Sequence, residues 1–180
     1  MRHVILISVT AAFVATAIGP GTAQAQQWIE YVNRDLRFSI NFPHQPREEE
    51  IAYTTRYDAT VPAYVFSAEQ NTGRYVITVV DYSGQPTDTH TAISHAVQVL
   101  REKGEVTYDA FANLDGIPGQ QLSLTGPDRR LVQAIVYMFA DMLYIAEGSV
   151  AAGNPAPSQF QQTISIIDAQ GNRIVLDGED

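Results

Sequence analysis

The chain has 180 residues, with 11 lysines and arginines against 20 aspartates and glutamates, which give a net charge of −9. Proteins that bind nucleic acids neutralise phosphates with basic side chains, so this charge argues against nucleic-acid partners and against anionic membrane surfaces. The sequence contains no cysteine, so we expect packing alone, and neither disulfides nor a cysteine-ligated zinc ion, to stabilise the fold.

The N-terminus has the three-part layout of a secretory signal peptide, which we predict over residues 1–25. Arg2 precedes an apolar run that ends at Ile18, and the small residues Ala23 and Ala25 stand where a signal peptidase recognises its substrate. The run is shorter than the roughly 20 residues that a membrane-spanning helix needs. We therefore predict cleavage after Ala25, which leaves a periplasmic or secreted protein with no membrane span and no lipid anchor. An uncleaved N-terminal anchor is the alternative.

Residues 26–180 have the size of one domain, and no linker divides them. Apolar residues at every second position predict five strands in the first half: 28–32, 36–42, 49–57, 63–70 and 74–82. The last of these is apolar on both faces, since Ile77 and Val79 alternate with Val76 and Val80. A strand buried on both faces predicts a sheet that is covered on both sides.

Residues 87–103 change to a helical period, with apolar residues at i, i+3, i+4 and i+7 from Ile93 to Leu100. Thr87 or Asp88 is placed to cap the start of this helix. Gly104 stands where a left-handed residue commonly ends a helix.

The second half returns to strands, which we predict at 105–111, 119–125, 129–139 and 142–150. A helix over 158–168, capped by Ser158, and a short strand over 172–176 follow. Strands joined by short turns favour an antiparallel sheet. We therefore predict an α+β fold: a mainly antiparallel sheet of about six to eight strands with helices on both faces, an αβα sandwich.

The sequence lacks the patterns of common catalytic, metal and nucleotide sites. His90 and His95 are five residues apart and point in different directions on a helix, unlike the zinc-binding pair of an HExxH motif. The run Glu48-Glu49-Glu50 is typical of a protected sheet edge. We predict no catalytic, metal-binding or cofactor-binding residue and no cofactor. A hydrolase with a dispersed active site, which would place a histidine beside a carboxylate and a hydroxyl, stays an alternative.

Tyrosines are frequent in the predicted strands, and three of them, Tyr53, Tyr57 and Tyr64, are candidates for a contact surface. Tyrosine buries its ring while its hydroxyl reaches water, and it is enriched at protein interfaces. Packing within the sheet is the alternative, because aromatic residues favour strands in any case.

Four short patterns are spread over most of the chain after residue 25. They are Trp28…Tyr31 followed by Leu36-x-Phe38-x-Ile40-x-Phe42-Pro43-x-x-Pro46; Leu114-Asp115-Gly116-Ile117-Pro118-Gly119; Leu131…Ile135-x-Tyr137 with Leu143-Tyr144; and Phe160…Ile164. Together they resemble exported bacterial proteins with the PsbP-like fold, which PsbP of photosystem II shares with the Ran-binding Mog proteins. This resemblance implies an antiparallel sheet between helices and a binding role without catalysis.

The leading hypothesis is a periplasmic, non-catalytic binding or accessory module for a protein or a cell-envelope component. The alternatives are the hydrolase and a carrier of a small apolar ligand. A binding module would expose a patch of tyrosine or phenylalanine, whereas a carrier would contain a large apolar pocket.

Overall fold

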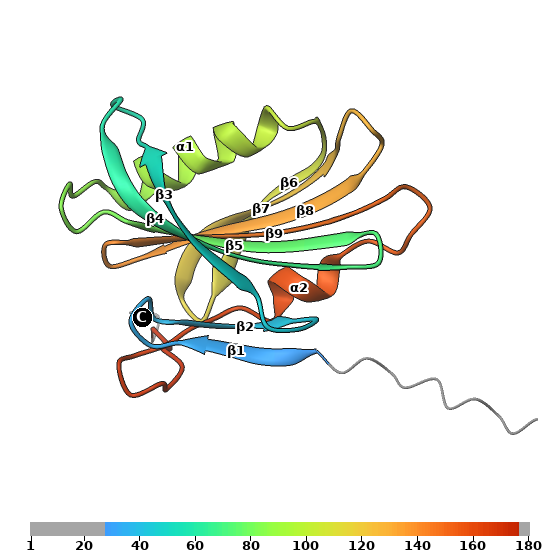
Figure 1. The fold of residues 1–180 in the computed structure, drawn as a ribbon. Coiled ribbons are helices and arrows are strands. Elements are labelled where there is room, and N and C mark those ends of the chain that lie inside the picture. The colour runs from blue at the N-terminus through green and yellow to red at the C-terminus, as the bar shows by residue number, and fades with distance from the viewer. Residues whose placement is uncertain (1–27, 177–180) are drawn as a thin grey trace, which may run out of the picture.

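The computed structural model describes residues 28–176, so the predicted signal peptide and the cleavage residues Ala23 and Ala25 lie outside the described residues. The described elements are β1 (Ile29–Asn33), β2 (Phe38–Phe42), β3 (Arg47–Thr54), β4 (Thr60–Gln70), β5 (Gly73–Asp81), α1 (Thr89–Arg101), β6 (Glu105–Leu114), β7 (Ile117–Thr125), β8 (Leu131–Phe139), β9 (Met142–Val150), α2 (Ser158–Gln162) and β10 (Ser165–Ile166) (Figure 1). Neither of these helices is long and apolar enough to cross a membrane.

Seven strands form one large sheet in the order β3-β4-β5-β9-β8-β7-β6, and every neighbouring pair is antiparallel. The sheet is antiparallel as predicted, because its strands follow one another through short turns. Strands with apolar residues on both faces lie in the interior of the sheet. In β5, for example, Ile77 and Val80 are both fully buried but belong to two separate clusters on opposite faces.

Helix α1 covers one face of the large sheet (Figure 1). Its buried residues, from Ala92 to Leu100, pack against apolar side chains of the central strands. Asp88 caps the helix as predicted, because its carboxylate accepts a hydrogen bond of 2.8 Å from the Thr91 backbone N–H. Gly104 is not left-handed, so its predicted role is wrong. It is needed for close approach: a Cβ at this position would lie 2.4 Å from the Thr125 carbonyl oxygen.

A second, three-stranded sheet in the order β1-β2-β10 covers the other face (Figure 1). Phe38, Ile40 and Phe42 of β2 are fully buried and form the centre of this layer of the core. The prediction of helices on both faces is therefore wrong. Apolar strands must be covered on both sides, and here an extended hairpin with a row of large apolar residues supplies most of that cover. The short helix α2 packs beside it and adds the fully buried Phe160 to the same cluster. The molecule is mostly antiparallel β, with two sheets and two helices.

The C-terminal part differs from its prediction in two further ways. Helix α2 ends at Gln162, and Ser165–Ile166 pair with β2 as β10, because the β-branched residues after α2 favour an extended backbone. Pro157 and not Ser158 is at the start of α2, and no side chain caps it. Residues 172–176 do not form a strand; Arg173 makes a single bridge with Ile167.

Candidate functional site

The edge strand β6 exposes a row of large apolar side chains. It lies at the end of the large sheet, and among residues 28–176 it pairs with β7 on one side only. Phe111 is 75% exposed, Tyr108 is 52% exposed and Val106 is 39% exposed. An edge strand also presents backbone N–H and C=O groups that no neighbouring strand pairs. The strand therefore offers both hydrogen-bonding groups and aromatic side chains to a partner.

A bulge and one partly exposed ion pair shape the surface of β6. The register shifts between Val106 and Tyr108, which places these two residues on opposite faces of the sheet. Phe111 lies three residues after Tyr108 in regular register, so it is on the opposite face from Tyr108. Asp109 is drawn toward α1 by an ion pair with Arg101 and by a hydrogen bond of 2.5 Å from the Gln120 amide. Burial alone would raise the pKa of Asp109, but these two hydrogen bonds outweigh it and hold the pKa below its ordinary value. The charge of Asp109 is thus neutralised within the fold.

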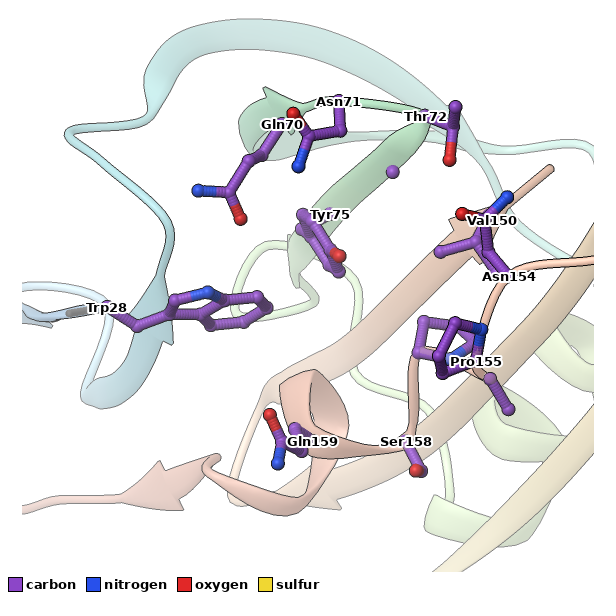
Figure 2. Close-up of a pocket in the computed structure, with 13 residues that line it drawn as sticks. Trp28, Gln70, Asn71, Thr72, Tyr75, Val150, Asn154, Pro155, Ser158 and Gln159 are labelled. Atoms are coloured by element: carbon purple, nitrogen blue, oxygen red, sulfur yellow. The ribbon is translucent and has the colours of Figure 1, made fainter. Parts of the chain in front are cut away.

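A pocket of about 430 Å³ lies at one end of the large sheet, far along the strand order from β6. It opens between the turn from β4 to β5 and the segment from the end of β9 to the start of α2 (Figure 2). Its volume is in the range of about 300–1,000 Å³ that is usual for ligand sites. The lining residues are Trp28, Gln70, Asn71, Thr72, Gly73, Tyr75, Val150, Asn154, Pro155, Ala156, Pro157, Ser158 and Gln159.

Packed aromatic rings form the base of this pocket. The rings of Trp28 and Tyr75 meet edge to face, with centroids 4.7 Å apart and an angle of 70° between the planes. Phe160, which is fully buried, contacts Tyr75 with centroids 5.4 Å apart. Burial raises the pKa of Tyr75, so its hydroxyl stays neutral. The pocket base is therefore continuous with the core and is held in one orientation.

Hydrogen bonds and close packing hold the two walls of the pocket at a fixed distance from each other. The Arg130 guanidinium donates hydrogen bonds to the Thr72 carbonyl oxygen at 2.9 Å and to the Ser149 carbonyl and hydroxyl oxygens at 3.2 Å. Gly148 allows Pro157 to pack against β9, since a Cβ there would lie 3.0 Å from the Pro157 Cβ. These contacts fix the spacing between the β4–β5 turn and the start of α2.

An apolar groove of about 260 Å³ lies beside α1 and is the feature that the carrier alternative would use. Its lining includes Val65, Val76 and Ile145 from the sheet and Val99 from α1. Lys103 and Glu147 form an ion pair of 2.5 Å at the groove.

The structure does not bring the three candidate tyrosines together on one surface. Tyr53 packs under α1, and its hydroxyl is buried without a hydrogen-bond partner among residues 28–176. Tyr64 packs against the cluster on the opposite face of the sheet. Tyr57 follows β3 and is 72% exposed. Whether any of them contacts a partner stays a prediction.

The two candidate histidines both lie on α1 but differ in their surroundings. The His95 ring Nε2–H donates to the Thr54 carbonyl oxygen at 3.0 Å, and the ring packs edge to face against Tyr53. His90 is exposed in the first turn of α1. Within residues 28–176, no three histidine, aspartate or glutamate side chains are grouped to hold a metal ion.

Sequence reasoning missed both the aromatic edge of β6 and the pocket at Trp28. The alternation that marks an exposed strand face is broken in β6 by the bulge after Val106. The pocket joins residues that are far apart in the sequence, such as Trp28, Tyr75 and Gln159.

No family model matches this sequence, and comparison with curated proteins finds no match. Among solved structures, the chain is similar to the solution structure of cyanobacterial PsbP (CyanoP) from Synechocystis sp. PCC 6803, with a TM-score of 0.53. The two share 12% sequence identity, and the match covers 82% of this chain and 97% of that chain. The chain thus has a PsbP-like fold, as the sequence patterns predicted.

Proposed function

We propose that this chain is an exported, non-catalytic accessory module that binds an extended segment of a partner protein along the free edge of β6. The observation that carries the proposal is the exposure of Tyr108 and Phe111 on a strand whose outer edge is unpaired within the described residues. A partner strand would gain main-chain hydrogen bonds from this edge, while contacts with the two exposed aromatic rings would favour apolar side chains in the partner.

The chemistry of the edge narrows the partner segment. Tyr108 and Phe111 lie on opposite faces of the sheet, so the partner would place large apolar side chains on both of its faces. Glu105 is exposed at the start of β6, and the chain carries a net charge of −9. A basic residue opposite Glu105 would add a favourable cross-strand pair and faster association.

Export through a cleaved signal peptide is part of the same proposal, with residues 26–180 acting as a single domain in the periplasm. The basic start, short apolar run and small residues before position 26 support it. Intact-mass measurement of the exported protein is expected to show a chain that begins at Gln26. A chain that still begins at Met1 would contradict export by cleavage.

Site-specific photo-cross-linking tests the binding edge. The photoreactive residue p-benzoylphenylalanine replaces Phe111 in one variant and Tyr57 in the control, which are 75% and 72% exposed in the native protein. Both replacements should leave the fold intact because both side chains lie on the surface. Irradiation of periplasmic extract is expected to give an adduct at position 111 and none at 57, with the cross-linked peptide mapping to a short apolar segment of the partner.

Binding by strand addition also predicts the hydrogen-exchange pattern. Backbone amides of β6 should become protected when the purified partner segment is added, while those of β3 should not change. Equal adducts at positions 111 and 57, or no adduct at 111, would contradict the proposal. An adduct between two copies of this chain would replace it with self-association through β6.

A further inference from the structure

We propose that the pocket at Trp28 binds an uncharged saccharide. This site is independent of the β6 edge, since β7, β8 and β9 separate the pocket's β5 from β6 in the large sheet. The two proposals are therefore tested by different experiments.

The pocket lining has no charged side chain, although the chain as a whole is strongly acidic. An anionic ligand would meet no counter-ion in the lining, because the nearby Arg130 guanidinium is not part of it and is engaged by Thr72 and Ser149. Such a ligand would also be repelled by the net charge of −9. A cationic ligand would meet no carboxylate in the pocket. Burying an unpaired charge is costly, so the lining selects a neutral ligand.

Residues with amide and hydroxyl side chains, from two separate segments, line this space. Asn71 and Thr72 come from the β4–β5 turn, whereas Ser158 and Gln159 come from the start of α2 (Figure 2). Among residues 28–176, none of these four side chains makes a hydrogen bond to another described residue. Amides and hydroxyls both donate and accept, which matches the hydroxyl groups of a sugar.

The aromatic rings at the base of the pocket provide the apolar contacts that a sugar ring makes with a protein. A saccharide ring has one face of C–H groups, which carry a slight positive charge and pack on the negative face of an aromatic ring. Trp28 is partly exposed, and Tyr75 and Phe160 hold it from behind. Because these contacts fix the indole before any ligand arrives, binding costs little ordering of the site.

The arrangement of the rings favours a saccharide over a proline-rich peptide. Peptides of that kind dock along grooves lined by aromatic rings. Trp28 and Tyr75 meet at 70° and form one corner, and Pro155 and Pro157 stand on the opposite wall. The resulting space is a compact pocket that fits one ring stacked on Trp28.

Trp28 is the single tryptophan of the chain, so its fluorescence reports directly on the pocket. Titration with N,N′-diacetylchitobiose, an uncharged disaccharide, is expected to change the emission of Trp28 in a saturable way. The negatively charged sugar glucuronate and the positively charged sugar glucosamine should bind at least about tenfold more weakly, since neither charge finds a partner.

A matched pair of variants on α2 ties the signal to the pocket. Gln159 lines the pocket and Gln162 does not, yet both are exposed on the same short helix. Gln159→Ala should weaken binding about threefold to tenfold through the loss of one hydrogen bond, while Gln162→Ala should leave it unchanged. Calorimetry on Trp28→Ala, whose fold is checked by circular dichroism, should show no measurable binding.

Three results would overturn this proposal. The first is no change in Trp28 emission with millimolar N,N′-diacetylchitobiose, maltose or cellobiose. The second is equal weakening by Gln159→Ala and Gln162→Ala, which would place the sugar elsewhere. The third is binding of a proline-rich peptide at Trp28 in place of any sugar.

Discussion

The two edge strands of the large sheet, β3 and β6, differ in the kind of side chain that they expose. In the part of the chain that the structure describes, both strands leave backbone groups without a neighbouring strand along one side. Strand β3 carries Arg47 and the run Glu48-Glu49-Glu50, all of them exposed. Strand β6 carries Val106, Tyr108 and Phe111 on its surface, and its central charge, Asp109, is paired with Arg101.

Charged residues on an edge strand discourage pairing with other chains, whereas exposed apolar residues permit it. The charges of β3 are those of an edge protected against pairing, and the exposed apolar residues of β6 support the proposal that β6 pairs with a partner. One of the glutamates of β3 also has a structural role, because the Tyr31 hydroxyl donates a hydrogen bond of 2.6 Å to Glu48. That bond ties β1 of the small sheet to the edge of the large sheet.

The largest expected effect separates a structural phenylalanine from an interacting one. Phe42→Ala removes a fully buried ring and should lower the free energy of unfolding by about 3–5 kcal/mol. Phe111→Ala removes a ring that is 75% exposed and should change it by less than about 0.5 kcal/mol. Urea denaturation of both variants measures the difference. If Phe111→Ala cost more than about 1 kcal/mol, Phe111 would be a structural residue and the contrast between the edges would fail.

A second prediction concerns the bond that fixes β3 to the small sheet. Burial, and then the hydrogen bond to Glu48, raise the pKa of Tyr31 to about 12, whereas an unfolded tyrosine titrates near about 10. The folded state therefore favours the neutral phenol. This stabilisation is complete below pH of about 10 and is lost as the pH rises through about 12.

The variant Tyr31→Phe should lower the free energy of unfolding at pH 8 by about 1 kcal/mol, because it deletes the hydrogen bond and keeps the ring. Denaturation at pH 8 and pH 11 measures the effect. The wild type should lose more stability between these two values than Tyr31→Phe does. An equal loss in both proteins would show that the fold does not raise the pKa of Tyr31, and no effect of Tyr31→Phe at pH 8 would show that the hydrogen bond to Glu48 does not stabilise the fold.

Most of the strands, and α1, could be predicted from the sequence, because apolar periods of two and of 3.6 residues are local signals. The layer that covers the second face of the large sheet could not be predicted. Phe38, Ile40 and Phe42 alternate with polar residues as in any half-buried strand, and that pattern does not state which sheet the strand joins. The strand β10 was also hidden, since Ser165 and Ile166 are extended through their pairing with β2 and not through a pattern of their own.

The candidate sites were harder to predict than the fold for a related reason. The run Glu48-Glu49-Glu50 predicted a protected edge, and β3 is at an edge. That β6 is the opposite edge depends on the order of seven strands, which no single segment encodes. The pocket depends on Trp28, Tyr75 and Gln159 meeting in space, so it became visible only in the folded chain.

A third prediction concerns Asp109, the charged residue of β6 that is paired with Arg101. Since hydrogen bonds lower the pKa of Asp109, its stabilising effect is present above the unfolded value of about 4 and is lost as the pH falls through the folded value. Asp109→Asn should lower the free energy of unfolding at pH 7 by about 0.5–1 kcal/mol and should flatten its dependence on pH below about 4. Glu105→Gln, on the same strand, is the control. If the two variants gave the same acid profile, the pairing of Asp109 with Arg101 would not be what neutralises β6.

The smallest expected change in stability provides the most direct comparison of the edges. Glu49→Val and Glu50→Val together remove two exposed charges from β3 and give it the apolar character of β6. Because both side chains lie on the surface, the free energy of unfolding should change by less than about 0.5 kcal/mol. The variant should nevertheless associate at high concentration, since the last six residues of this eight-residue edge strand then carry no charge and become available to a second copy. Light scattering after size exclusion measures this association, with Glu69→Val, exposed on the neighbouring β4, as the control. A variant that remained as monomeric as the wild type would mean that the glutamates do not protect β3, and that charge is not what distinguishes the two edges.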